Sequence, residues 1–190
     1  EEQIVNCIAE IVAKFGKLDI LIANLGTGKG SQEWNIDNEN WNRMMDMNFN
    51  AARKTVNAAV QHMPKETGSS ITFISSIAGV EVIGAPIHYS VAKAALIAYS
   101  TNLSKKLASD NIRVNSVCPG NIYFKEGTWD FKMLENKDKV EEMLEKDVPL
   151  KRFTTPEEIA NLVLFLSSEK AGFITGSCII SDGGQTVGIQ

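Results

Sequence analysis

Residues 18–23 read Leu-Asp-Ile-Leu-Ile-Ala, a short and almost unbroken apolar run flanked by Gly16 and Gly26. Such a run is typical of a strand that is buried on both faces of a sheet. A helical pattern of apolar residues precedes it up to about Phe15, and loop residues 24–30 follow it. The stretch therefore predicts a helix, a buried strand and a loop in that order, which is the repeating unit of an α/β protein.

The same alternation continues along the chain. Further strands are predicted at 71–75, 112–117 and 177–181, and further helices at about 38–63, at about 87–109 and from about 155 onward. Parallel strands joined by helices need right-handed crossovers, so we predict a doubly wound parallel sheet with helices on both faces. Because ligands in such sheets bind beyond the carboxyl ends of the strands, the loops 24–30, 75–88 and 118–130 are expected to converge on one cleft.

The composition argues against several classes of protein. The 190 residues carry 19 Lys+Arg and 23 Asp+Glu, a net charge of −4, with no basic face for nucleic acid. No apolar run approaches the roughly 18 residues of a membrane span. Cys7, Cys118 and Cys178 are widely separated, which fits free thiols in a reducing compartment, and the two histidines have no metal-ligand spacing. We therefore expect a cytoplasmic protein without a metal, a nucleic-acid partner or a membrane span.

The pattern that carries chemistry is Tyr89-Ser90-Val91-Ala92-Lys93. On a helix, the i, i+4 spacing places the phenol of Tyr89 and the ammonium of Lys93 on one face. A positive charge beside the phenol lowers its pKa from about 10, so that Tyr89 could exchange a proton with an alcohol or ketone oxygen. Ser76 ends the preceding strand, where its hydroxyl could stabilise charge on the same oxygen. Taken singly, these residues also fit an ordinary amphipathic helix and an ordinary turn.

Taken together, Ser76, Tyr89 and Lys93 resemble the catalytic set of the short-chain dehydrogenase/reductase family. Other matches stand in the family's order and at about its intervals: Asn24-Leu25-Gly26, Met47-Asn48-Phe49, the run Arg-Val-Asn-Ser-Val-Cys-Pro-Gly at 113–120, Pro156-Glu157-Glu158-Ile159-Ala160 and Asp182-Gly183-Gly184. Each motif is weakly specific, whereas their common order over nearly the whole chain is highly specific. The resemblance implies a Rossmann-like enzyme that interconverts a ketone and a secondary alcohol with NAD or NADP, for example on a 3-oxoacyl or sugar-type substrate.

The resemblance also implies a role for each matching residue. Tyr89 would be the general acid/base, Lys93 would hold the nicotinamide ribose and Ser76 would orient the substrate oxygen. Asn48 would hold a water that links Lys93 to solvent. The remaining matches would lie along the cofactor, namely Asn24, Gly26, Pro119, Gly120 and Ile122. The implied assembly is a homotetramer or homodimer in which the helix at 87–109 packs against its symmetry mate.

Residues 121–150 are expected to form a substrate lid within a single domain, 1–190. Lids of this kind close over a cofactor and exclude water. Tyr123, Phe124 and Trp129 could line an apolar or sugar-like substrate, and His88 is expected to be structural. The mixed charges from Lys132 to Glu145 indicate a solvated helix rather than a site for a charged ligand.

Departures from the family leave two alternatives open. The glycine-rich first turn for the pyrophosphate is absent, as is the residue that selects NAD or NADP, and residues 26–30 follow the wrong strand to replace that turn. We therefore expect that βα units of roughly 60 residues are missing before the capless start at Glu1. One alternative is a catalytically inactive, truncated remnant or interaction subunit of the same fold. The other is an enzyme that uses this fold for a non-redox reaction such as dehydration or epimerisation.

Overall fold

The computed structural model describes residues 1–188 and contains a four-stranded parallel sheet in the order β1-β2-β3-β4. The strands are β1 (Ile20–Ala23), β2 (Ser69–Ile74), β3 (Ile112–Pro119) and β4 (Cys178–Ser181). In the register, Ile71 lies between Leu21 and Val114, and Val117 pairs with Ile179. The predicted parallel sheet is therefore confirmed.

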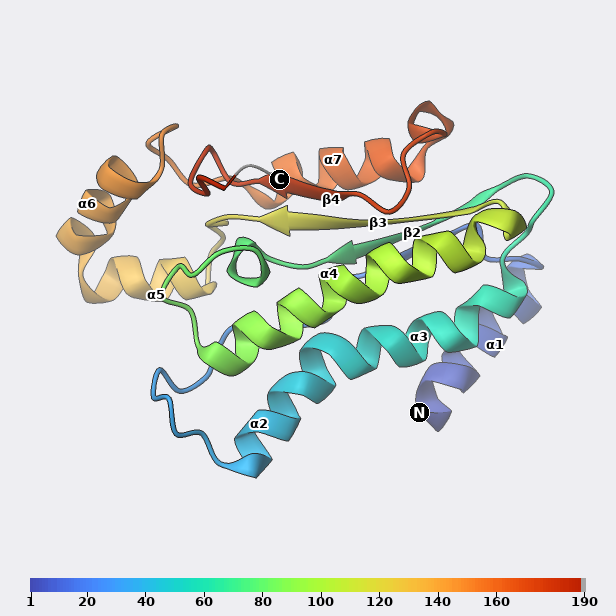
Figure 1. The fold of residues 1–190 in the computed structure, drawn as a ribbon, viewed down its shortest axis with the longest axis horizontal. Coiled ribbons are helices and arrows are strands. Elements are labelled where there is room, and N and C mark those ends of the chain that lie inside the picture. Colours follow the sequence, from blue (N-terminus) through green and yellow to red (C-terminus); the bar gives the residue numbers. More distant parts are fainter. Residues whose placement is uncertain (189–190) are drawn as a thin grey trace.

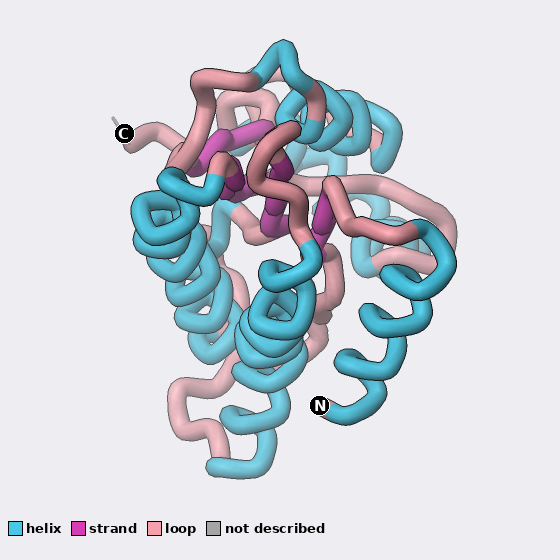
Figure 2. Tube along the Cα trace, turned by 90° about the vertical axis from the view of Figure 1, so that its right-hand side faces the viewer, coloured by secondary structure: helices cyan, strands magenta, loops and turns pink. Residues whose placement is uncertain are grey.

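Helices cover both faces of the sheet, as Figures 1 and 2 show. Their bounds are α1 (Glu2–Phe15), α2 (Asn38–Met45), α3 (Ala51–Ala59), α4 (Ile87–Leu107), α5 (Thr128–Glu135), α6 (Lys137–Asp147) and α7 (Pro156–Ser167). Helices α3 and α4 pack on one face and α7 packs on the other. Their ends follow the sequence signals: α1 stops at Gly16, whose φ of 82° is left-handed, and Asp37 caps α2 by accepting from the amide of Asn40.

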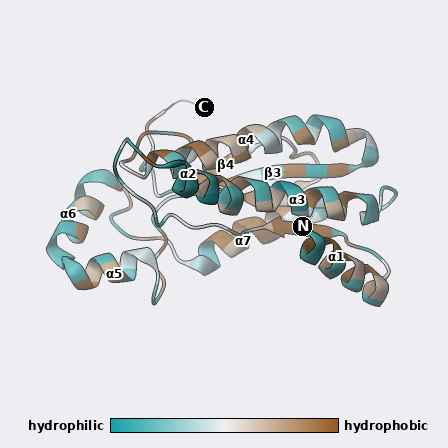
Figure 3. Ribbon diagram, turned by 90° about the horizontal axis from the view of Figure 1, so that it is seen from below, coloured by the Kyte–Doolittle hydropathy of each residue, from teal (hydrophilic) through white to brown (hydrophobic). Residues whose placement is uncertain are grey.

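The core consists of two clusters, one on each face of the sheet. The first lies between the sheet and the helices α3 and α4, and it includes Val56, Leu96 and Phe73, each at most 1% exposed. The second lies under α7, where Val163 and Leu166 pack with Val117. Figure 3 shows the contrast between α7, which carries many apolar residues, and the largely hydrophilic α6. None of the helices in the described residues is long and apolar enough to cross a membrane.

The expectation that residues 18–23 are buried on both faces is wrong. Leu21 and Ala23 are buried, but Ile20 and Ile22 are 45% and 47% exposed. The physical reason is that β1 forms an edge of the sheet, while α7 packs on β2 and β3. An open apolar groove lined by α7 residues therefore lies over Ile20 and Ile22.

The helix expected at about 38–63 is present, but it is not a regular α-helix. A π turn, Asp46–Asn50, joins α2 to α3, and the amide of Ala51 bonds to the carbonyl of Asp46 five residues earlier. Asn48 lies in the middle of this turn and is fully buried. Because π turns inside helices are frequent at functional sites, Asn48 is a candidate site residue.

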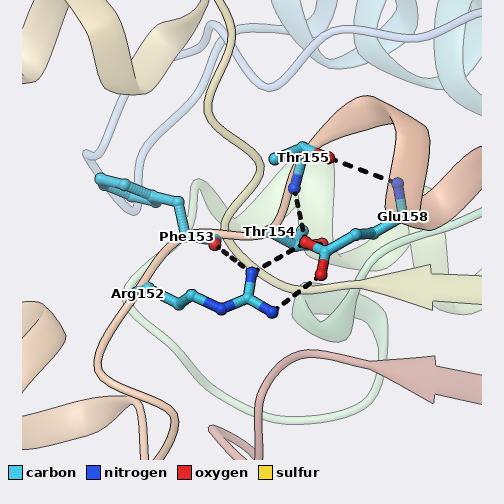
Figure 4. A network of polar contacts seen from close by, with 5 residues as sticks. All are labelled: Arg152, Phe153, Thr154, Thr155 and Glu158. Carbon is cyan, nitrogen blue, oxygen red and sulfur yellow. Dashed lines mark hydrogen bonds and ion pairs between the residues drawn. The ribbon is translucent and has the colours of Figure 1, made fainter.

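The segment expected to form a lid lies beyond the carboxyl ends of the strands as α5 and α6 (Figure 1). Its return to the sheet is fixed at the start of α7, where Arg152 donates two hydrogen bonds of 2.8 and 2.7 Å to the carboxylate of Glu158 (Figure 4). Thr154 and Thr155 also donate to that carboxylate. These bonds, with Arg152 foremost, lower the pKa of Glu158 to about 2. Glu158 thus closes a capping box and holds the lid's base in place.

Candidate active site

A cavity of about 430 Å³ opens between the segment 121–150, which was expected to form a lid, and the carboxyl ends of the strands. The three loops that were expected to converge do so here. The loop after β1 contributes Gly28, Lys29 and Gly30 to the lining, the loop after β2 contributes Ser76–Ala78 and Ile83–Pro86, and the loop after β3 contributes Gly120, Asn121, Ile122 and Phe124. Tyr89 on α4 and Trp129 on α5 also line the cavity. The predicted cleft is confirmed.

Ser76 and Tyr89 meet in this cavity. Ser76 caps a short 3-10 turn, Ile77–Gly79, and its Oγ accepts a 3.1 Å hydrogen bond from the amide of Ala78. The hydroxyl proton of Ser76 therefore remains available to an oxygen in the cavity. Burial raises the pKa of the Tyr89 phenol above its ordinary value, and a hydrogen bond from Ser76 acts against this rise. At neutral pH, Tyr89 consequently carries its proton.

Lys93 lies beneath the ring of Tyr89. Its Nζ is 5.8 Å from the ring centroid and donates a 2.9 Å hydrogen bond to the carbonyl of Ile74. The side chain is buried, and burial lowers the pKa of Lys93 to about 8. Burial has the largest effect on the pKa of the Tyr89 phenol and raises it, so the expected lowering of that pKa by Lys93 stays a prediction.

Asn48 holds the first part of the loop that follows β1. Its Oδ1 accepts a 3.0 Å hydrogen bond from the amide of Thr27, and its Nδ2 donates to the carbonyl of the same residue at 3.1 Å. Gly26 lies so close that a Cβ on it would stand 2.6 Å from the Asn48 Oδ1 and 3.2 Å from the Lys93 Nζ. Only glycine allows the main chain to lie this near both side chains.

Two further glycines of the loop after β1 lie beside residues of α4, Gly28 in ordinary contact and Gly30 in very close contact. A Cβ on Gly28 would lie 3.8 Å from the Tyr89 ring, and one on Gly30 would lie 2.5 Å from the His88 ring. His88 is 1% exposed and lies 6.1 Å from the ring of Trp41, in agreement with a structural role. The alternation of glycines directly after a strand is the signal from which this packing could have been inferred.

The remaining residues that were expected near a cofactor are divided between two places. Gly120 and Ile122 line the cavity, and Pro119 is buried at the end of β3 just before them. Asn24, in contrast, lines the apolar groove beside Ile22 and α7. Of the aromatic lid residues, Phe124 and Trp129 line the cavity. Tyr123 does not, because its hydroxyl donates a 2.6 Å hydrogen bond to Asp130.

Two lysines that line the cavity were not expected from the sequence. Lys29 comes from the loop after β1 and Lys132 from α5, and both line the cavity. Their ammonium groups lie over aromatic rings, Lys29 at 5.3 Å from the Phe131 centroid and Lys132 at 4.3 Å from that of Trp129. Within residues 1–188 neither forms an ion pair. Lys132 is exposed, as expected of a solvated helix, and it also lines the cavity.

Comparison with known proteins gives consistent matches over nearly the full chain. A family model described as Enoyl-(Acyl carrier protein) reductase matches residues 1–186. The 3-oxoacyl-[acyl-carrier-protein] reductase FabG of Thermotoga maritima is 32% identical over 186 residues, which make up 98% of this chain and 73% of that protein. The acetoacetyl-CoA reductase of Shinella zoogloeoides is 33% identical over 184 residues, covering 97% and 74% of the two chains.

Solved structures agree with these sequence matches. A crystal structure of L-sorbose reductase from Gluconobacter frateurii, complexed with NADPH and L-sorbose, superposes with a TM-score of 0.91 at 31% identity. The match covers 99% of this chain and 74% of that one. An oxidoreductase of the short-chain dehydrogenase/reductase family from Burkholderia thailandensis superposes with a TM-score of 0.85 at 34% identity, over 95% and 69% of the two chains.

Proposed function

The chain belongs to the short-chain dehydrogenase/reductase family, an NAD(P)-dependent family of oxidoreductases, and we propose that it interconverts a ketone and a secondary alcohol with Tyr89 as general acid/base. The observation that carries this proposal is geometric: Ser76 and Tyr89 line one cavity, and the ammonium of Lys93 lies beneath the Tyr89 ring. A protonated phenol is what ketone reduction requires, and burial keeps the proton of Tyr89 in place.

The residues of the cavity fit a nicotinamide cofactor, NAD or NADP. Because Gly26 has no side chain, the main chain after β1 lies close to the Lys93 ammonium, along the path expected for the cofactor. Lys93 bonds one carbonyl, that of Ile74, and its other N–H groups would donate to the ribose hydroxyls. Gly120 and Ile122 would lie along the nicotinamide. When bound, the nicotinamide supplies or accepts the hydride, and the protein supplies orientation and proton handling.

We assign the proton path to four side chains, those of Ser76, Tyr89, Lys93 and Asn48. The Ser76 hydroxyl would donate to the substrate oxygen and hold it against the Tyr89 phenol, which would pass its proton to that oxygen as negative charge develops. Lys93, with a pKa of about 8, would then return a proton toward Tyr89. Asn48 would complete the path to solvent through a water, and its own amide fixes the loop at Thr27.

The cavity walls favour one of the two substrate examples. Lys29 and Lys132 both line the cavity and form no ion pair within residues 1–188, and the lining holds a single carboxylate, Asp147. A 3-oxoacyl thioester carried on a phosphorylated arm has an anionic end that these lysines would attract, whereas a neutral sugar has none. We therefore assign the substrate to the 3-oxoacyl class, with Phe124 and Trp129 against the acyl chain.

Oxidation of NADPH and NADH by the purified protein, with acetoacetyl-CoA or L-sorbose as the ketone, tests this assignment. We expect turnover with acetoacetyl-CoA to exceed that with L-sorbose. Lys29→Met together with Lys132→Met should raise KM for acetoacetyl-CoA roughly two- to fivefold, as loss of exposed ion pairs does, and leave KM for L-sorbose unchanged. Equal effects on both substrates would contradict the assignment. If neither NADPH nor NADH is oxidised when either ketone is supplied, the result would instead favour the inactive remnant.

We also propose a homotetramer or homodimer assembled through α4, within a reducing cytoplasm. An apolar stripe of Ile87, Val91, Ala94 and Ala98 is exposed along one face of α4, at helical spacing. Sedimentation velocity should detect the oligomer, and Val91→Glu should shift it toward the monomer because a carboxylate would be buried between two helices. Leu134→Glu on α5, where the side chain is exposed to solvent but lies off the stripe, should not. A monomeric parent chain would remove the proposal.

A further inference from the structure

Two thiols lie in contact on neighbouring strands, next to the cavity. Cys118 is on β3 and Cys178 is on β4, and their sulfur atoms are 3.1 Å apart. In the parallel register, Cys178 pairs with Ser116 and Cys118 pairs with Ile180. Residues two apart on a strand share one face, so the two cysteines point to the same side of the sheet, diagonally across the pair of strands.

The two thiols differ in access and in acidity. Cys118 is fully buried, whereas Cys178 is partly exposed and can meet a small reagent. The hydrogen bond from Cys118 lowers the pKa of Cys178 to about 7, and the same contact together with burial raises the pKa of Cys118. Since the thiolate is the nucleophile in thiol chemistry, Cys178 is the sulfur that reacts first.

We propose that Cys118 and Cys178 form a reversible disulfide when the protein meets a low-molecular-weight disulfide such as oxidised glutathione. The Cys178 thiolate attacks one sulfur of the oxidant, forms a mixed disulfide and releases one thiolate. The Cys118 thiol then loses its proton and attacks the Cys178 sulfur, which releases the second thiolate. Two protein thiols are thereby oxidised, and one molecule of oxidant is reduced to two thiols.

This disulfide would act on the cavity through Cys118. The residue directly precedes Pro119 and Gly120 and follows Val117, whose carbonyl accepts a 2.8 Å hydrogen bond from the backbone amide of Ser75. Ser75 in turn donates a 2.9 Å hydrogen bond to the carbonyl of Lys93. The cysteine pair is thus connected to Lys93 through Ser75, and to the cavity through Gly120.

Formation of the Cys118–Cys178 disulfide would require the backbone near the cavity to move. A disulfide holds its sulfurs about 2.05 Å apart, so the contact must shorten by about 1 Å. Gly120 already lies so near Asp182 that a Cβ on it would stand 2.8 Å from that residue. Since a misplacement of about 1 Å at an active site can cost up to about a hundredfold in rate, we expect the oxidised protein to lose roughly tenfold in turnover. This effect on turnover, unlike the disulfide itself, rests on the proposed function.

The test begins from a Cys7→Ser variant, because Cys7 is an exposed third thiol. After treatment with oxidised glutathione, mass spectrometry should find the loss of two hydrogens, and non-reducing peptide maps should link the peptides of Cys118 and Cys178. In the same background, Cys118→Ser should retain glutathione on Cys178, and Cys178→Ser should take up none. Two free thiols after treatment, or a persistent glutathione adduct when both cysteines are present, would overturn the proposal.

Activity provides the second readout. Dithiothreitol should restore the turnover that oxidation removes in the Cys7→Ser variant, while Cys178→Ser should keep its turnover through both treatments. If the peptides are linked and turnover is unchanged, the modification site stands and its connection to the cavity is overturned. The peptide map is also obtained with the unsubstituted chain, so the outcome does not depend on the folding of any variant.

Discussion

The Tyr89→Phe variant should lose about 10²- to 10⁴-fold in ketone-dependent oxidation of NADPH, which is the usual contribution of a general acid. The substitution removes one oxygen from a side chain that lines the cavity and leaves the ring over Lys93 in place. Steady-state kinetics measures the loss, and fluorescence titration with NADPH should show unchanged cofactor binding. The two measurements together separate loss of the acid from loss of the site.

Tyr99→Phe provides the matched control. Tyr99 lies on the same helix, and its ring packs edge-on against Phe49 and Phe73 in the core, away from the cavity. Removal of this hydroxyl should leave turnover within about twofold of the parent, since only the phenol in the cavity meets the substrate. Similar turnover of Tyr89→Phe and the parent would show that another group supplies the proton.

The second large effect is expected for Gly79→Ala, which should destabilise the protein by about 1–3 kcal/mol and also lower turnover. A Cβ on Gly79 would stand 2.7 Å from the backbone nitrogen of Ala94 and 2.7 Å from the backbone carbon of Lys93. Both atoms belong to the main chain of α4, which cannot shift locally without breaking the helix. The turn that carries Ser76 must therefore move away from the helix.

Urea denaturation measures the loss as a lower midpoint. Gly28→Ala is the control for stability, because its Cβ would meet nothing closer than 3.8 Å, which is ordinary contact with the Tyr89 ring. Equal midpoints for the parent and Gly79→Ala would contradict the close approach of the two backbones. A lower midpoint with unchanged turnover would contradict only the link between this turn and the position of Ser76.

Much of the architecture could be predicted because it follows from local patterns and one topological rule. The apolar runs and their caps are local, as at Gly16 and at the capping box of Thr155 and Glu158. Convergence of the loops follows because carboxyl ends of parallel strands meet at one edge. The exposure of Ile20 and Ile22 could not be predicted in this way, since an apolar run looks alike in a central and an edge strand.

The candidate residues of the site could be named from the sequence, but their pKa values and the charged residues around them could not. The sequence shows that Lys93 is near Tyr89, but the depth of burial that raises the pKa of the phenol belongs to the folded chain. Lys29 and Lys132 are far apart in the sequence and face one cavity only because α5 folds back beyond the strands. Likewise, Cys118 and Cys178 become neighbours through strand pairing, which no spacing encodes.

The π turn at Asp46–Asn50 has a consequence for how such a site changes in evolution. A π turn accommodates one residue more than an α turn, so it corresponds to a single-codon insertion in a helix. Loss of that codon would let α2 and α3 join as one regular α-helix. Asn48 would then lose the bulge that now brings its amide against Thr27. The number of residues in this turn, as much as the identity of any side chain, therefore sets the position of Asn48.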